Sequence, residues 1–432
     1  MRFLGIGDYA DLGDLYLRLM ADGHEVRVCV LDPRSQDMFA GMIERVPDWR
    51  AELGWVRGAG RDGIILFEGA NAGATQDALR AEGYNVIGGS AFGDRLENDR
   101  AFGQAILRDA GVRTVAAHEF DSFERAIDFV RQGRRRYVYK PNGSNVESMQ
   151  TYVGAMDDGE DIVALLEINR RSWDKSRRPS FILMAHVTGV EVGVGAYFNG
   201  ERFLEPACID WEHKHFFNND LGELTGEMGT LVSYRGAGPI FSATLAKVAP
   251  SLQASGYCGY INVNTIVNDD GIWPLEFTAR FGYPGYAILD ALHEEGWDAI
   301  FSRMIRRDGT SFRTAAGFAV GIVLTVPPFP YQAGYGELSK GLPILFRGTL
   351  DAAARRHLHF SEVAMSDGRL VTAGMVGQVM VVTGRGNTVE AAQRRSYDLV
   401  RRVVVPNLRY RTDIGDRFLR HDRAELERLR LL

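Results

Sequence analysis

The chain has 432 residues, about three times the length of a typical single domain, so it has room for several domains with sizeable cores. Hydrophobic residues make up 45% and charged residues 25%, close to the average for folded globular proteins, which excludes collagen-like and disordered classes. The 50 Lys and Arg residues against 56 Asp and Glu residues give a net charge of −6. The chain as a whole therefore does not attract nucleic acid or an anionic membrane.

Cysteine usage and hydropathy predict an intracellular protein. Cys29, Cys208 and Cys258 are few, odd in number and far apart, so they do not indicate a disulfide framework. Residues 1–5 lack the apolar core of a signal peptide. The longest apolar run, residues 315–326, is too short to span a bilayer, which takes about 20 residues, and predicts a buried strand. We therefore expect a cytoplasmic protein with no membrane partner.

The first 90 residues predict a small α/β layer. Residues 2–5 and 25–31 are typical of strands and residues 12–21 of a helix between them, which together make a βαβ unit. Two more short strands are expected at residues 64–67 and 85–87, each followed by a glycine-rich turn.

The rest of the chain predicts a helix, a central sheet and a C-terminal unit. Residues 94–111 have an amphipathic helical pattern, and residues 137–140 predict a short strand. Apolar and polar residues alternate as in an antiparallel central sheet at residues 181–185, 190–197, 258–267 and 272–277. A further unit of strands ends in helices at residues 389–402 and from residue 413.

A glycine motif after the first strand leaves its ligand open. Gly5, Gly7 and Ala10 form a GxGxxA pattern, and Asp32 ends the second strand, as in dinucleotide-binding proteins. Two glycines at a βα turn are common in α/β sheets, so another anion, or no ligand, fits equally well. The sequence has no GxxxxGK[ST] phosphate loop and no GxSxG elbow, which argues against a P-loop NTPase and a serine hydrolase of that type.

Two histidine pairs are candidates for metal binding. His213 with His215, and His357 with His359, would each share one face of a strand. A zinc site needs further ligands, and none has suitable spacing, so surface or hydrogen-bonded histidines are the alternative interpretation.

A series of polar residues along the chain indicates a phosphate site. Lys140 ends a strand and precedes a short polar turn, where an ammonium and backbone N–H groups could face a phosphate. Glu276 lies on a strand with Thr278 two residues later on the same face, an arrangement that suits Mg²⁺ held against phosphate oxygens.

Several motifs in order give the chain a resemblance to a known family. Glu97 and Arg100 match a helix start, and His213 and Lys214 are followed by residues 225–229, which read TGEMG against a family pattern TGxMG. Residues 276–282, EFTARFG, resemble a metal-binding motif of the same family. Over nearly its whole length the chain resembles the ATP-grasp ligases, in particular the glycinamide ribonucleotide synthetase family.

The resemblance implies a mixed α/β and α+β multidomain protein with the ATP-grasp fold. It implies a Rossmann-like pre-ATP-grasp domain at residues 1–90 and an ATP-grasp core at residues 91–311. The core would include a mobile lid at about residues 115–187. An α+β capping domain would occupy residues 312–432.

The resemblance also implies the cofactors, ATP with Mg²⁺ or Mn²⁺, and a set of site residues. Lys140 would contact the α- and β-phosphates, Glu191 the ribose hydroxyls, and Glu276 the metal, with Thr278 and Asn264 as further ligands. Arg280 would face the γ-phosphate or an acyl phosphate, as a catalytic residue beside Lys214 and His213. The other residues of the implied ATP site are Arg100, Asn142, Gly143, Ser144, Met184 and His186.

The implied activity is amide formation between a small-molecule carboxylate and an amine. ATP would convert the carboxylate to an acyl phosphate, which the amine then attacks, with release of ADP and phosphate. No protein nucleophile is needed, and no Ser-His-Asp or Cys-His signature is present.

Departures from the family pattern predict an altered acceptor site. Arg100 replaces a family Lys and Thr278 a family Asn. The substrate-side loops change more, and Asp8 puts an acid where a phosphate should bind. The residues expected at the substrates are Gly7, Asp8, Glu68, Gly69, Thr225, Gly226, Met228 and Gly229.

Three alternatives stay open beside a divergent carboxylate–amine ligase. The chain could be the purine-pathway enzyme of the family itself, or a non-catalytic nucleotide-binding protein, or, more remotely, a nicotinamide oxidoreductase. The sequence does not decide between a monomer and a homodimer.

Overall fold

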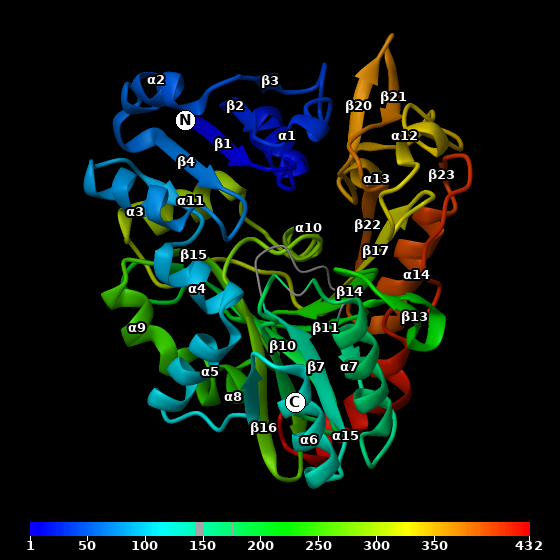
Figure 1. Ribbon diagram of the computed structural model, residues 1–432. Helices are drawn as coiled ribbons and strands as arrows, with labels where there is room; N and C mark the ends of the chain where they lie inside the picture. The colour runs from blue at the N-terminus through cyan, green and yellow to red at the C-terminus, as the bar shows by residue number, and fades with distance from the viewer. Residues whose placement is uncertain (143–150, 175) are drawn as a thin grey trace.

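The computed structural model describes residues 1–142, 151–174 and 176–432, so the expected ATP-site residues Gly143 and Ser144 lie outside the described residues. An N-terminal sheet and a C-terminal hairpin region stand on either side above a large central sheet (Figure 1). A smaller sheet with two helices lies against the lower part of the central sheet in the same view.

The N-terminal sheet is parallel, as the βαβ pattern predicts. Its strand order is β3-β2-β1-β4-β5, and β1 and β4 are almost entirely buried, as is typical of strands covered on both faces. The strands are β1 Arg2–Gly7, β2 Glu25–Val30, β3 Glu44–Arg45, β4 Gly63–Phe67 and β5 Val86–Ile87. The helices are α1 Gly13–Ala21, α2 Leu53–Arg57 and α3 Gly73–Ala81.

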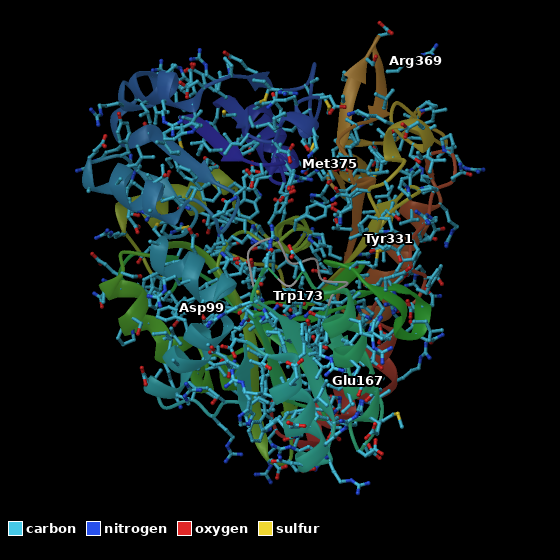
Figure 2. The ribbon with its side chains drawn as sticks, in the orientation of Figure 1. Asp99, Glu167, Trp173, Tyr331, Arg369 and Met375 are labelled. Atoms are coloured by element: carbon cyan, nitrogen blue, oxygen red, sulfur yellow. The ribbon has the colours of Figure 1, made fainter. Side chains whose placement is uncertain are left out.

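Residues 94–111 are helical as predicted, but the prediction of a single helix is wrong. The chain forms two helices there, α4 Ala91–Asn98 and α5 Arg100–Asp109. Asp99, labelled in Figure 2, has extended backbone angles, and its side chain accepts a hydrogen bond from the Phe102 amide at 3.0 Å. Asp competes with the helix by capping, so it ends one helix and begins the next.

A four-stranded antiparallel sheet in the order β6-β9-β7-β8 forms a separate packing unit. Its strands are β6 Ala117–Phe120, β7 Tyr137–Pro141, β8 Tyr152–Val153 and β9 Phe181–Ala185, and its helices are α6 Phe123–Gly133 and α7 Glu160–Ser172. The prediction that residues 181–185 belong to the central sheet is therefore wrong. Alternation does not specify which sheet a strand joins, and Phe181 packs on Phe123 of α6, with ring centroids 5.3 Å apart.

The central sheet has eight strands, in the order β16-β15-β10-β11-β14-β17-β22-β19. They are β10 Val190–Asn199, β11 Cys208–Glu212, β14 Gly229–Ser233, β15 Cys258–Asn268, β16 Gly271–Thr278, β17 Phe318–Thr325, β19 Leu358–Phe360 and β22 Gln378–Gly386. All of their pairings are antiparallel. The expected strand at residues 315–326 is β17, and the sheet continues through it without interruption.

Further helices cover the sheet, and short hairpins extend from it. The helices are α8 Gly238–Ala243, α9 Ala249–Ala254, α10 Gly285–Asp290, α11 Trp297–Arg306, α12 Tyr335–Leu338, α13 Ala352–Arg355, α14 Val389–Val400 and α15 Arg423–Arg428. The remaining strands are β12 His215–Phe217, β13 Leu221–Leu224, β18 Leu345–Phe346, β20 Val363–Ser366, β21 Arg369–Thr372 and β23 Val403–Val404. The C-terminal helix expected from residue 413 begins later, with a π-helical turn at Phe418–Asp422 that leads into α15.

One hydrophobic core joins the N-terminal sheet, the central sheet and the C-terminal segment, and includes Phe3, Val192 and Val381. The smaller sheet has its own core, which includes Tyr137 and Leu183. The domain boundaries at residues 90 and 311 stay a proposal, because packing is shared across them. In the described part of the chain, no helix is long and apolar enough to cross a membrane.

Candidate functional site

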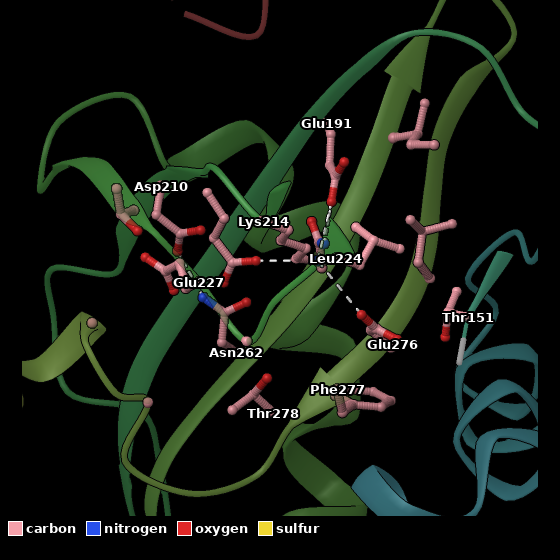
Figure 3. Close-up of a pocket in the computed structure, with 18 of the residues that line it drawn as sticks. Thr151, Glu191, Asp210, Lys214, Leu224, Glu227, Asn262, Glu276, Phe277 and Thr278 are labelled. Carbon is pink, nitrogen blue, oxygen red and sulfur yellow. Dashed lines mark hydrogen bonds and ion pairs between the residues drawn. The ribbon is translucent and has the colours of Figure 1, made fainter. Parts of the chain in front are cut away.

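A cleft of about 540 Å³ lies between the central sheet and the smaller sheet, within the range of ligand pockets. Its floor is one face of β16, β15, β10 and β11, and the smaller sheet contributes Val138, Lys140 and Met184. Figure 3 shows carboxylates, amides and one lysine pointing from neighbouring strands into the same space.

Strand register explains why these polar groups meet. Glu276 pairs with Asn264, Asn264 with Gly193, and Gly193 with Asp210, so one row crosses four strands. Side chains alternate between the two faces of a sheet, so residues two apart in each strand point into the cleft together. The alternating polar residues of β11, β15 and β16 are thereby gathered on one face.

Glu276 is surrounded by cations. Its carboxylate accepts a hydrogen bond from Lys140 Nζ at 3.1 Å and another from Arg100, and it lies 3.6 Å from Lys214 Nζ. Lys140 and Arg100 reach it from β7 and from the start of α5. The positive charges of Lys140, Arg100 and Lys214 outweigh burial and hold the pKa of Glu276 well below its usual range.

Lys214 lies among three carboxylates. Its ammonium is 3.1 Å from Glu191, 3.2 Å from Glu212 and 3.6 Å from Glu276. Burial lowers the pKa of Lys214, but the three acids outweigh it and raise the pKa well above the usual value. Asn264 donates to Glu191 Oε1 at 2.7 Å, so Asn264 and Lys214 together fix this carboxylate.

One end of the cleft is apolar. Val138, Met184, Val187, Ile266 and Leu275 line it, and Met184 and Ile182 form a small buried cluster there. His186 also lines this end, and burial together with Arg136 lowers its pKa.

Arg280 lines the cleft from the segment after β16. Its Nε donates to Glu97 Oε1 at 2.9 Å, and Glu97 also accepts from the Ala279 amide at 2.8 Å. Glu97 therefore fixes both the backbone and the guanidinium at this point.

The end of the cleft opposite the apolar one is acidic, which the sequence analysis missed. Asp210 and Glu227 are 5% and 7% exposed, and Asn262 donates to Asp210 Oδ2 at 2.7 Å. Figure 3 shows Asp210, Glu227 and Asn262 grouped together, away from Glu276. The sequence could have indicated this acidic group. Asp210 and Glu212 are two residues apart and so share one face of a strand, and Glu227 fills the variable position of the TGxMG pattern.

Not every predicted site residue lines the cleft. The cleft is lined by Arg100, Lys140, Met184, His186, Glu191, Lys214, Thr225, Gly226, Asn264, Glu276, Thr278 and Arg280. His213 is buried behind it, where its Nε2 accepts a hydrogen bond from the Gly415 amide at 3.3 Å. Met228 packs in an apolar cluster with Phe216, and Gly229 lies in β14. Asn142 bonds to Ser180 at the end of β7.

The predicted residues of the N-terminal loops form a group of their own. Asp8 accepts from Asn71 at 2.6 Å, and Tyr16 donates to Glu68 at 2.6 Å. A side chain at Gly7 would come within 2.2 Å of the Glu68 carboxylate, so Gly7 makes room for it. Gly69 follows Glu68 in this loop.

The two candidate histidine pairs are arranged as hydrogen-bonded side chains, the alternative interpretation. The chain leaves the strand at His213, so His213 and His215 do not share a face, and His215 bonds to the Gly222 carbonyl. His357 and His359 both bond to Thr383 Oγ1, at 2.9 and 3.1 Å. Among the described residues, no three His, Cys, Asp or Glu side chains are grouped to hold a metal ion by themselves.

The cleft nevertheless fits Mg²⁺ held with nucleotide phosphates. Mg²⁺ is commonly bound by one or two carboxylates together with phosphate oxygens and water. Glu276 supplies a carboxylate that stays ionised, and Thr278 supplies an oxygen from the same face of β16. Lys140 and Arg100 lie beside it as phosphate-binding cations.

Two family models match the chain in succession. The model of the phosphoribosylglycinamide synthetase ATP-grasp (A) domain matches residues 98–286, and that of the C domain of the same enzyme matches residues 319–417. Phosphoribosylamine–glycine ligase of Ralstonia nicotianae is 23% identical over 367 residues, 83% of this chain and 84% of the relative. The Vibrio parahaemolyticus enzyme of that name is 24% identical over 359 residues, 81% of each chain.

Solved structures show the same fold. Phosphoribosylamine–glycine ligase from Thermotoga maritima superposes with a TM-score of 0.73 at 21% identity, covering 96% of this chain and 100% of that one. The biotin carboxylase domain of the Hydrogenobacter thermophilus 2-oxoglutarate carboxylase, in complex with MgADP, has a TM-score of 0.66 at 11% identity, covering 99% and 97%.

The chain is therefore an ATP-grasp enzyme, an ADP-forming C–N ligase that uses ATP with Mg²⁺. Within the ATP-grasp superfamily it is similar to the phosphoribosylglycinamide synthetases, whose A-domain and C-domain models match it in succession. The resemblance, fold class, enzyme class and cofactors predicted from the sequence are confirmed.

Proposed function

We propose that the chain is a carboxylate–amine ligase that forms an amide through an acyl phosphate and has an acceptor site different from that of phosphoribosylamine–glycine ligase. The observation that supports it most directly is the grouping of Lys140, Arg100 and Lys214 around Glu276 in one cleft. Cations fixed in advance stabilise charge on a transferring phosphoryl group.

Different parts of the cleft would bind different parts of MgATP. ATP would place its adenine against Met184 and its neighbours at the apolar end, and its ribose hydroxyls at Glu191. Lys140 and Arg100 would bind the phosphates. Bound Mg²⁺, held by Glu276 with Thr278 and Asn264, would neutralise charge on the triphosphate.

The transfer step follows from the chemistry of a carboxylate. The carboxylate oxygen attacks the γ-phosphorus, the bond to the bridging oxygen breaks, and ADP leaves. The amine nitrogen then attacks the acyl carbon, phosphate leaves, and the nitrogen gives up a proton. Arg280, fixed by Glu97, and Lys214 would stabilise the acyl phosphate, since both line the cleft.

The loop after β1 supports a changed acceptor. Asp8 and Asp11 replace neutral or basic groups of the family loop, and Glu68 lies beside Asp11, buried. Burial, then the charge of Asp11, raises the pKa of Glu68 to about 8. Burial also raises the pKa of Asp11, although the positive charge of Arg280 lowers it. A ribose 5-phosphate would meet Asp8 and Asp11 where the family loop has neutral or basic residues.

The enzyme of the relatives is a second candidate function. The relatives match 81–83% of this chain along most of their own length, and both carry the name phosphoribosylamine–glycine ligase. A true ligase of that kind would require the altered loops to rearrange around a phosphate.

Product analysis separates the candidates. The protein is incubated with ATP, Mg²⁺, glycine and freshly made phosphoribosylamine, beside a panel of other amino acids and amines, and products are identified by mass spectrometry. ADP is measured in the same tubes. An amide from another pair supports the proposal, whereas glycinamide ribonucleotide formed at a useful rate overturns it. Nucleotide binding with no ADP from any pair would indicate a non-catalytic protein.

A further inference from the structure

The acidic end of the cleft contains side chains that have no role in the proposed ATP site. Asp210 lies in the same strand row as Glu276 but three strands away, about 14 Å across the sheet at the usual strand spacing. Thr230 of the neighbouring strand β14 pairs with Glu212 of β11. Glu227 lies in the loop before β14. All of these side chains line the cleft.

Polar atoms at this end lack partners. Asp210 Oδ1, Glu227 Oε1 and Thr230 Oγ1 are buried and make no hydrogen bond within the described residues. Thr230 is a neutral side chain only 2% exposed, so its free hydroxyl is evidence separate from the acids. Buried polar groups nearly always have a partner, so three together indicate a missing ligand with hydrogen-bond donors.

The charge of that ligand follows from the same groups. Burial, followed by repulsion from Glu212, raises the pKa of both Asp210 and Glu227. Lys214 lowers both pKa values, but its ammonium is already bonded to Glu191 and Glu212. A cation at this end would offset the repulsion, whereas an anion would add to it.

Two glycines of β10 make room for the polar side chains of this end of the cleft. A side chain at Gly193 would come within 2.1 Å of Asp210 Oδ1, and one at Gly195 within 2.1 Å of the Tyr260 hydroxyl. These two positions of β10 lie between Asp210 on β11 and Asn262 on β15. The missing side chains let Asn262 reach Asp210 across the intervening strand.

We propose that Asp210 and Glu227, with Thr230 and Asn262, form a subsite for an ammonium group of the amine substrate. An ammonium has three donors and no acceptor, which matches the free oxygens of Asp210, Glu227 and Thr230. This proposal rests on the proposed ligase function, because only that function makes the bound ammonium part of a substrate. The group bound is either the reacting amine before it loses its proton or a second ammonium of a diamine.

The test measures binding without turnover. Isothermal titration calorimetry in the presence of Mg²⁺ and a non-hydrolysable ATP analogue follows 1-aminobutane, 1,4-diaminobutane and, as the anionic counterpart, butyrate. The proteins are the wild type, Asp210→Asn, Glu227→Gln and, as a matched control, Glu337→Gln, which removes an exposed acid on α12.

We expect the wild type and the Glu337→Gln variant to bind at least one amine. Each cleft variant should bind it at least tenfold more weakly, since bonds to charged groups are the strong ones. Binding of both amines supports a site for the reacting group, and binding of the diamine alone supports a second ammonium.

Two results would overturn the proposal: no amine binding by the wild type, or equal binding by the wild type and both cleft variants. Nucleotide affinity and ADP formation are measured on the same preparations. Retained amine binding without ADP from any substrate pair would count against the proposed function alone, and amide formation with unchanged amine binding in both variants would count against the ammonium subsite alone.

Discussion

Replacing Glu276 by Gln should separate the structural role of this carboxylate from its chemical role. Gln has nearly the same shape but no charge, so Lys140 and Arg100 would lose the anion that holds them together, and Lys214 would lose one of its three. We expect the free protein to be less stable and ATP turnover to be nearly abolished.

The magnitude follows from the contacts of Glu276. It accepts two charge-assisted hydrogen bonds, from Lys140 and Arg100. Such bonds are about twice as strong as neutral ones, so the change costs about 1 kcal/mol for each bond, and about 2 kcal/mol together. Its side chain is 28% exposed, which keeps the cost below the roughly 3–5 kcal/mol of breaking a fully buried pair. The Tm should fall by about 4 °C, at roughly 2 °C per kcal/mol for a folding unit of 150–250 residues.

Thermal unfolding and ADP release measure the two effects. Excess ATP without Mg²⁺ should restore part of the lost Tm, because phosphate oxygens replace the missing negative charge beside Lys140. Turnover with Mg²⁺ should fall at least ~100-fold, the loss typical of removing one group that stabilises transition-state charge. Lys140→Ala should abolish turnover as well, through lost nucleotide binding.

The control is Glu119→Gln, which removes an exposed acid from β6 and should change neither measurement. ADP formation by the Glu276→Gln variant at the wild-type rate would refute the metal assignment. An unchanged Tm in the free protein would refute the claim that this carboxylate holds Lys140 and Arg100 in place.

Three further predictions concern the other acids. Asp8→Ala should change the preferred acceptor by mass spectrometry while ATP affinity stays within about threefold; an unchanged product profile would contradict this. In spite of burial, Arg18 and His359 lower the pKa of Asp14 to about 2, so its stabilisation is present above the unfolded pKa near 4 and is lost as pH falls toward 2. The stability difference between wild type and Asp14→Asn should therefore shrink by about 2 kcal/mol over that interval in acid titrations of unfolding, and a constant difference would count against it. Asp210→Asn should raise the Tm most at alkaline pH, where the native carboxylate must ionise against its neighbours; a lower Tm at every pH would contradict the repulsion.

The sequence predicted the elements better than their assembly. Hydrophobic periodicity placed most of the strands that it predicted within two residues, because burial alternates locally along the chain. It did not assign residues 181–185 to the smaller sheet, since the partner strand β7 is about 40 residues away and leaves no local mark. The break at Asp99 was visible in principle, as Asp is a strong N-cap residue, but the amphipathic pattern on both sides hid it.

The sequence also predicted which site residues come together better than it predicted where each side chain points. Lys140, Glu191, Lys214 and Glu276 belong to ordered motifs, and the structure brings all four into one cleft. His213 belongs to a motif too, yet its side chain turns away, because the chain leaves β11 at that residue. Motif membership therefore predicts proximity along the chain, whereas the direction of each side chain depends on where the strand ends.

The acids of one strand row show that position determines chemistry here. Glu276 and Asp210 lie on the same face, joined through Asn264 and Gly193 by register. Three cations keep the pKa of Glu276 low, whereas burial and neighbouring acids raise that of Asp210. One row would thus bring an ionised carboxylate to a metal and phosphates at one end, and at the other end a buried carboxyl whose ionisation an ammonium would favour.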